Sequence, residues 1–115
     1  MDHQRWIQNF PAAITVCDAK RTILAMNEKA GKTFQKSGGK DLEGKNLFDC
    51  HPEPAQEKMK KLMESKSTNA YTIEKNGAKK LIFQSPWFEN GMVAGLVEIS
   101  MEIPKEMPHF IRKNA

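Results

Sequence analysis

The sequence contains residue types that can act in catalysis, but they are scattered along the chain. Cys50 and His51 are adjacent and supply the types of a thiol nucleophile and its base. Neighbouring side chains in an ordered segment often point apart, so we expect structural roles for both. Ser85, Ser100 and Glu98 would complete a hydrolytic triad by type, yet no Gly-x-Ser-x-Gly sequence frames a nucleophile and no glycine-rich phosphate loop is present. We therefore predict that the chain is not an enzyme.

The two cysteines favour neither a disulfide nor a metal site. Cys17 and Cys50 lie far apart and form no Cys-x-x-Cys pair. A structural zinc site needs about four cysteine or histidine ligands at close spacing, and only Cys50 and His51 are close. We expect two reduced thiols and no bound metal.

Length and charge point to one ordinary domain. The chain has 115 residues and a net charge of +4, from 18 basic and 14 acidic side chains. The positive surplus is spread along the sequence, and the densest basic run, residues 58–61, is flanked by Glu57 and Glu64, as on a solvated helix face. There is no apolar run of about 18 residues and no apolar signal segment. These features predict no nucleic-acid partner, no membrane span and a cytoplasmic location.

The order of the expected elements predicts an α+β fold. Asn76-Gly77 and Asn90-Gly91 separate three β-rich runs, and Asn-Gly between such runs is a strong hairpin signal. Asn27 has the position of a helix N-cap. The helices are placed between the second and third strands of one antiparallel sheet. We expect a helix over 3–10, strands over 14–17 and 22–26, a helix from 28 to about 37, a short helix or turn within 40–48, a helix from 54 to about 65, and strands over 70–74, 79–88 and 92–103.

The helix that begins near Pro54 has a clear apolar stripe. Ala55, Met59, Leu62 and Met63 follow the spacing i, i+4, i+7, i+8. This stripe predicts that Met59 belongs to the core, while proline suits the first helical position.

Several segments together resemble the PAS family. Residues 23–30, with Asn27 after a strand, look like the family's second strand and its asparagine. Residues 44–48, Gly-Lys-Asn-Leu-Phe, followed by His51-Pro52-Glu53, look like its "Gly-Lys-x-Leu-x-Asp … His-Pro-Glu" stretch, and residues 96–103 look like its last strand. The chain is also similar to small bacterial proteins that consist of one PAS domain without an effector. The resemblance covers residues 11–104 and implies a five-stranded sheet, a small cavity enclosed by helices, and sensing or dimerisation rather than turnover.

Two cofactor-binding branches of this family can be compared with the sequence. In the flavin-binding photosensors, a cysteine bonds the flavin at the position that Leu47 occupies here, so that photochemistry is not expected. In the haem-binding oxygen sensors, a Pro-Glu-Pro precedes a ligating histidine, and Pro52-Glu53-Pro54 matches, but Met59 falls at the histidine's place. Methionine can ligate haem iron, so a haem-binding redox or gas sensor stays an alternative. The cofactor is left unknown.

The last two strands divide their side chains between two faces. A two-residue loop at Asn90-Gly91 would place Phe83 opposite Glu98, whereas a glycine-bulge turn places Phe83 beside Val97 or Ile99. The second register separates apolar from mixed residues, so we prefer it. It leaves an apolar outer face, which an isolated monomer would have to cover. The amphipathic N-terminal segment can cover it, either from the same chain or from a partner, and we hypothesise a homodimer through this face. The candidates for this dimer face are Trp6, Ile7, Phe10, Leu81, Phe83, Trp87, Val97, Ile99 and Met101.

The mixed face is the one that the resemblance directs toward the helices and the cavity. Its polar residues Gln84, Glu98 and Ser100 need partners if they are buried, and a polar ligand is one candidate. The alternative, which we favour, is that Glu98 lies near an edge of the sheet and reaches water. We expect the ligand-cavity candidates to be His51, Met59, Met63, Ile82, Gln84, Leu96, Glu98 and Ser100.

The predicted function is a sensory or interaction module without an effector in this chain. Residues 1–10 form an N-terminal cap, 11–104 the PAS domain and 105–115 a tail. The expected partners are a second copy of the chain, a signalling protein and a possible small-molecule ligand. A small enzyme on a related α+β fold, with Glu98 and His51 as the acid–base pair, is a second alternative.

Overall fold

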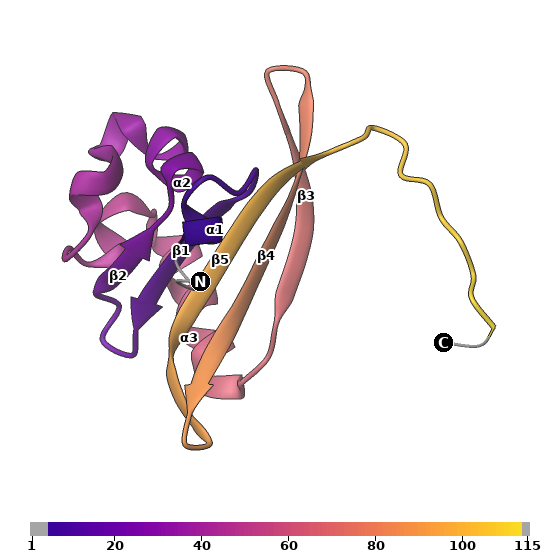
Figure 1. Ribbon diagram of the computed structural model, residues 1–115. Coiled ribbons are helices and arrows are strands. Elements are labelled where there is room, and N and C mark those ends of the chain that lie inside the picture. Colours follow the sequence, from indigo (N-terminus) through magenta and orange to yellow (C-terminus); the bar gives the residue numbers. More distant parts are fainter. Residues whose placement is uncertain (1–4, 114–115) are drawn as a thin grey trace.

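The computed structural model describes residues 5–113, the side chain of Cys50 excepted. It consists of one five-stranded antiparallel sheet with the helices packed on one face (Figure 1). The predicted α+β class and the insertion of helices between the second and third strands are confirmed. The elements are α1 (Arg5–Gln8), β1 (Ala13–Asp18), β2 (Ile23–Met26), α2 (Glu28–Thr33), the 3-10 helices η1 (Gln35–Ser37), η2 (Gly39–Leu42) and η3 (Leu47–Cys50), α3 (Glu53–Ser65), β3 (Asn69–Lys75), β4 (Ala78–Glu89) and β5 (Met92–Ile103).

The strand order is β2-β1-β5-β4-β3, so the last strand lies in the middle of the sheet. β5 pairs with β1 on one side and with β4 on the other, both antiparallel. This pairing joins the first hairpin to the last three strands, as Figure 1 shows. Residues 104–113 then leave the sheet without regular secondary structure.

The helices begin and end within a few residues of the predicted positions. Asn27 caps α2, because its side chain accepts a hydrogen bond from the Ala30 backbone N–H. α2 ends at Thr33 and continues as η1, which differs from a single helix reaching residue 37. α3 begins at Glu53, one residue before Pro54, and ends with Lys66 in the left-handed conformation.

Both Asn-Gly pairs form hairpin turns, which confirms the three-stranded meander. At each turn both residues have positive φ, 53° and 80° at Asn76 and Gly77, and 51° and 78° at Asn90 and Gly91. Positive φ at both central residues is typical of the two-residue type I′ turn.

The preferred register is confirmed, but a glycine-bulge turn does not produce it. Phe83 pairs with Ile99, whereas the two-residue turn pairs Glu89 with Met92. The shift occurs further along, where Ala94 is an extra residue between the pairs Phe88↔Val93 and Trp87↔Gly95. The two-residue turn and the bulge inside β5 together therefore produce the Phe83–Ile99 pairing that was expected from a glycine-bulge turn.

The core lies between the sheet and the helices. Met59 and Leu62 of α3 are buried, and Ala55 and Met63 pack against the core from its edge, so the predicted apolar stripe is confirmed. The other buried apolar residues of this cluster are Ala13, Cys17, Ile23, Met26, Ala30, Leu42, Leu47 and Leu96.

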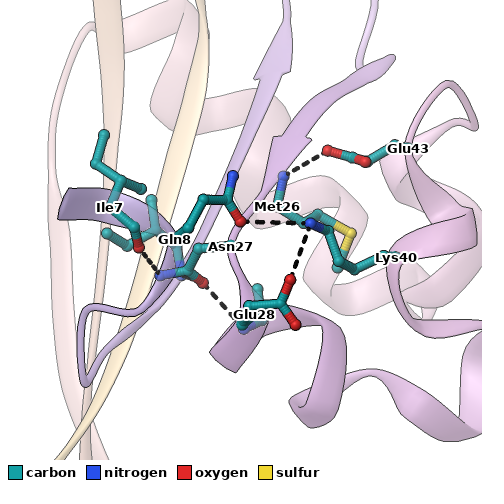
Figure 2. A network of polar contacts seen from close by, with 9 residues as sticks. Ile7, Gln8, Met26, Asn27, Glu28, Lys40 and Glu43 are labelled. Atoms are coloured by element: carbon teal, nitrogen blue, oxygen red, sulfur yellow. Dashed lines mark hydrogen bonds and ion pairs between the residues drawn. The ribbon is translucent and has the colours of Figure 1, made fainter. Parts of the chain in front are cut away.

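A polar network attaches the N-terminal segment to the start of α2 (Figure 2). Asn27, 1% exposed, donates from Nδ2 to the carbonyl oxygens of Ile7 and Ala12 over 2.9 and 2.8 Å. Lys40 reaches both Gln8 and Glu28 at 3.4 Å. The network fixes residues 7–12 at the junction of β2 and α2.

Of the described helices, none is long and apolar enough to cross a membrane.

Candidate ligand cavity and outer sheet face

A row of polar side chains crosses the inner face of the sheet, the face that the helices cover. The strand registers align Thr15 of β1, Glu98 of β5, Gln84 of β4 and Asn69 of β3. Asn69 Nδ2 donates to Gln84 Oε1 over 2.9 Å, and Gln84 Nε2 donates to Glu98 Oε2 over 2.8 Å. Because Gln84 is only 4% exposed, these hydrogen bonds satisfy a side chain that would otherwise be costly to bury.

The Glu98 carboxylate is the negative charge of this row. Among residues 5–113, no lysine, arginine or histidine forms an ion pair with it, and the side chain is half-buried. Its charge acts on Tyr71: burial first, and then the nearby Glu98 carboxylate, raise the pKa of the Tyr71 phenol. The carboxylate is therefore close to the phenol and can accept further hydrogen bonds.

The helices close this part of the sheet into a cavity of about 190 Å³. Phe34 follows α2, Ala55 belongs to α3, and His51 lies between η3 and α3. The His51 Nδ1 lies 2.9 Å from the Leu47 carbonyl oxygen, so Nδ1 carries the hydrogen in this contact. The His51 and Phe34 ring centroids are 6.0 Å apart, which joins the loop to α2.

Five of the eight cavity candidates line this space. They are His51, Ile82, Gln84, Glu98 and Ser100. The other three do not reach it. Met59 and Leu96, each 1% exposed, are enclosed in the core, and Met63 lies at the core edge. The helix stripe and the sheet pack together there, and apolar packing leaves no free volume for a ligand.

The cavity also has walls that the sequence analysis missed. Tyr71 and Ile73 of β3 line it together with Thr15 of β1. Their alternation along each strand was a usable signal, because Tyr71 pairs with Ile82 and Thr15 with Glu98 on the inner face. The remaining lining residues are Ala13, Thr33, Phe34, Ala55, Lys75 and Lys80.

The candidates for the dimer face lie partly exposed in a single chain. Phe83 is 37% exposed and pairs with Ile99, while Leu81 pairs with Met101 on the same face. Trp87 is half-buried, because its Nε1 donates to the Cys17 carbonyl oxygen over 2.9 Å. Val97, Ile99 and Met101 are half-buried too.

The N-terminal candidates form their own small cluster. Trp6 and Phe10, 51% and 42% exposed, contact each other edge to face at 5.7 Å between ring centroids. Ile7 is half-buried, and its carbonyl is held by Asn27. Residues 3 and 4 of the predicted helix lie outside the described part of the chain.

The cavity does not fit the large cofactors of the resembling branches. About 190 Å³ is below the ~300–1,000 Å³ of pockets for drug-sized ligands, and haem and flavin are at least that large. Leu47 and Met59, at the positions that ligate or bond those cofactors, are both buried in the apolar core. Within residues 5–113, no three His, Cys, Asp or Glu side chains gather as around a metal ion.

The Cys17 thiol is part of the core rather than of the cavity. Its pKa is raised, chiefly by burial, which keeps it protonated and unreactive. The side chain of Cys50 lies outside the described structure.

Comparisons with known proteins agree with this geometry. The model of the PAS fold family matches residues 2–70. No curated protein sequence matches the chain significantly. Among solved structures, a sensory box sensor histidine kinase from Vibrio cholerae is 15% identical, with 86% of each chain covered and a TM-score of 0.65.

Two further structures have the same fold. VqmA bound to DPO, a Vibrio cholerae protein, is 13% identical over 85% of this chain and 55% of that one, with a TM-score of 0.68. The PAS domain of the histidine kinase ThkA is 19% identical over 78% of this chain and 97% of that one, with a TM-score of 0.62. Because the family model matches more than half of the sequence and the five-stranded fold agrees with it, this chain belongs to the PAS fold family.

Proposed function

We propose that this sensory PAS module binds a small molecule in the inner cavity and signals by protein contact, with the outer sheet face forming a homodimer. The observation that carries the ligand proposal is the Glu98–Gln84–Asn69 row, which ends in a carboxylate beside a partly enclosed cavity. A plain core would fill this position with apolar side chains, since burying polar groups costs free energy. The similar VqmA structure is bound to DPO.

The size and walls of the cavity define what it can take. A volume of about 190 Å³ suits a molecule smaller than a typical drug. Phe34, Ala55 and Ile82 give apolar contact, while Glu98, Tyr71 and Ser100 give directed polar groups. Such a mixture, mostly apolar with a few placed polar groups, is typical of sites that select one ligand.

Ligand binding is tested by native mass spectrometry of the protein purified from cells, beside its denatured mass. We expect a non-covalent excess mass in the wild type. Ser100→Leu fills the cavity and should abolish the excess, whereas Ser85→Leu makes the same change on the outer face and should keep it. A Ser100→Leu protein that retains the excess mass would contradict the ligand proposal, as would a wild-type protein that has no excess mass and binds no added ligand.

A small enzyme is the second candidate, because Glu98 and His51, the predicted acid–base pair, line the same cavity. This alternative requires turnover of the bound molecule. Incubating the identified ligand with the wild type and with Glu98→Gln decides it: a product formed only by the wild type supports catalysis, and an unchanged ligand supports sensing.

A further inference from the structure

A cleft rich in lysines opens beside the inner cavity. Its walls come from two places: Lys32 and Lys36 belong to α2 and η1, while Lys75 and Lys80 belong to β3 and β4. The cleft has a volume of about 810 Å³ and is open to solvent, and Glu102 is its one acidic wall residue. Of these four lysines, none forms an ion pair with any carboxylate in the described part of the chain.

The cleft is continuous with the cavity. Thr33, Lys75 and Lys80 line both spaces. A ligand in the cavity would therefore have one end near Glu98 and the other at the lysines. The charges are opposite at the two ends: the Glu98 carboxylate lies inside, and the four lysines lie outside, where Lys80 has Glu102 as its cross-strand neighbour.

The sheet register gives the length of this arrangement. Glu98 pairs with Gln84, and Lys80 lies four residues before Gln84 on the same strand, on the same face. Four residues of β-strand span about 13 Å, and both Lys80 and Glu98 line the inner cavity. The ligand's two charges should then be separated by several bonds rather than by one carbon.

From this polarity we infer that the ligand is a small zwitterion, with an ammonium group toward Glu98 and a carboxylate or phosphate toward Lys80 and Lys75. The inference rests on the proposed ligand-binding function and specifies its ligand class. A charge pair in a partly enclosed site is stronger than in bulk water, and a cleft lined by one sign of charge concentrates the opposite ion.

The test is a binding titration by isothermal calorimetry with a series of ω-amino acids, from glycine to 6-aminohexanoate. Butylamine and butyrate serve as single-charge controls for 4-aminobutyrate. We expect affinity to pass through a maximum at an intermediate length, with the best zwitterion at least tenfold tighter than either single-charge compound. Glycine, whose charges are too close together, should bind weakly.

Three variants assign the two ends. Glu98→Gln should lower the affinity for the zwitterion and for butylamine at least tenfold and leave the affinity for butyrate unchanged. Lys80→Gln should lower the affinity for the zwitterion and for butyrate several-fold and leave the affinity for butylamine unchanged. Lys58→Gln removes the same charge from an exposed position of α3 that lines neither the cavity nor the cleft. It should change none of the three affinities.

Two outcomes would overturn the inference. If butylamine binds as tightly as every zwitterion, the anionic group of the ligand does not contribute to binding. If butyrate binds as tightly as every zwitterion and Glu98→Gln does not change the zwitterion's affinity, the cationic group does not contribute to binding. A co-purified ligand that Ser100→Leu removes, but that no zwitterion displaces, would leave the proposed function standing and refute the ligand class. Absence of both a co-purified mass and any probe binding would refute the proposed function itself.

Discussion

At position 27, a single asparagine side chain satisfies backbone groups from three separate segments. Its Oδ1 accepts from Ile14 and Ala30, each over 3.0 Å, and its Nδ2 donates to Ile7 and Ala12. All four capacities of a buried amide are used. The sequence identifies the cap on α2, but the two donated bonds join segments far apart in the sequence and appear only in the fold.

We predict that Asn27→Ala destabilises the protein by about 4 kcal/mol or more. Loss of the cap costs about 1 kcal/mol, and each buried backbone group left without a partner adds about 1–3 kcal/mol. Asn46→Ala is the matched control, because its side chain accepts one hydrogen bond, from Phe48, and should cost about 1 kcal/mol. Urea unfolding measures both, and equal losses would contradict the proposed role of Asn27.

Tyr71 offers a direct measure of the Glu98 charge, because it is the chain's one tyrosine. Burial and then the carboxylate raise its pKa from the ordinary value of 10.0. We predict that Glu98→Gln lowers this pKa part of the way, since burial remains. Ultraviolet absorbance of the phenolate against pH measures it, with Glu89→Gln, at the far end of β4, as the control.

The sign of the effect on stability follows from the same shift. The folded state holds the Tyr71 phenol proton more tightly than the unfolded chain. The resulting contribution to the free energy of unfolding is therefore complete below pH 10.0 and falls as pH rises through the pKa of the folded state. A phenol that titrates identically in wild type and Glu98→Gln would show that the carboxylate does not act on Tyr71.

At the scale of the elements, the β4–β5 hairpin determines where the two faces of the sheet lie. The Asn90-Gly91 turn alone would place Phe83 opposite Glu98. The bulge at Ala94 shifts the pairing by one residue and brings Phe83 beside Ile99, which separates the apolar face from the polar row. Gly95 follows the bulge and lies against β1.

We predict that Gly95→Ala is strongly destabilising, by about 3 kcal/mol or more. A Cβ at this position would overlap the Cys17 carbonyl oxygen and crowd Trp87 Nε1, and neither the paired backbone nor its hydrogen bond can move freely. Gly77→Ala is the control, because a Cβ there meets no atom within 4 Å and costs only the ~1–2 kcal/mol of positive φ. Thermal unfolding that shows the Gly77 variant to be the less stable would contradict this account.

At the scale of the whole molecule, the two faces of the sheet differ in character. The inner face carries the polar row and the cavity, while the outer face presents partly exposed apolar side chains. A stable dimer buries about 1,200–2,000 Å² in total, and the proposed homodimer requires an interface of this size on the outer face. The same sheet would then connect the ligand to the partner.

We predict that wild-type protein sediments as a dimer and that Phe83→Glu sediments as a monomer. A charge at the centre of the outer face would be desolvated without a partner in the dimer, which is costly. Ile111→Glu, on the exposed tail, introduces the same charge and should leave the dimer intact. Sedimentation velocity distinguishes them, and a monomeric wild type at high micromolar concentration would contradict the homodimer proposal.

The sequence by itself determined the elements and their class. Asn-Gly pairs specify tight turns through their tolerance of positive φ, and the spacing of Met59 and Leu62 specifies a buried helix stripe; both are local effects. The face of each residue in β4 and β5 followed from alternation once the register was chosen. The order of those signals was also enough to suggest the family.

The tertiary structure alone decided which residues share the cavity. Met59 and Leu96 were candidates because they lie on inward faces, but packing between α3 and the sheet encloses them, while Tyr71 and Lys80 reach the open space from β3 and β4. The Ala94 bulge and the bonds of Asn27 to residues 7 and 12 likewise depend on segments that meet only when folded. Local conformational propensity depends on short stretches of sequence. The free volume of a cavity and the pairing of charges depend instead on how distant segments pack.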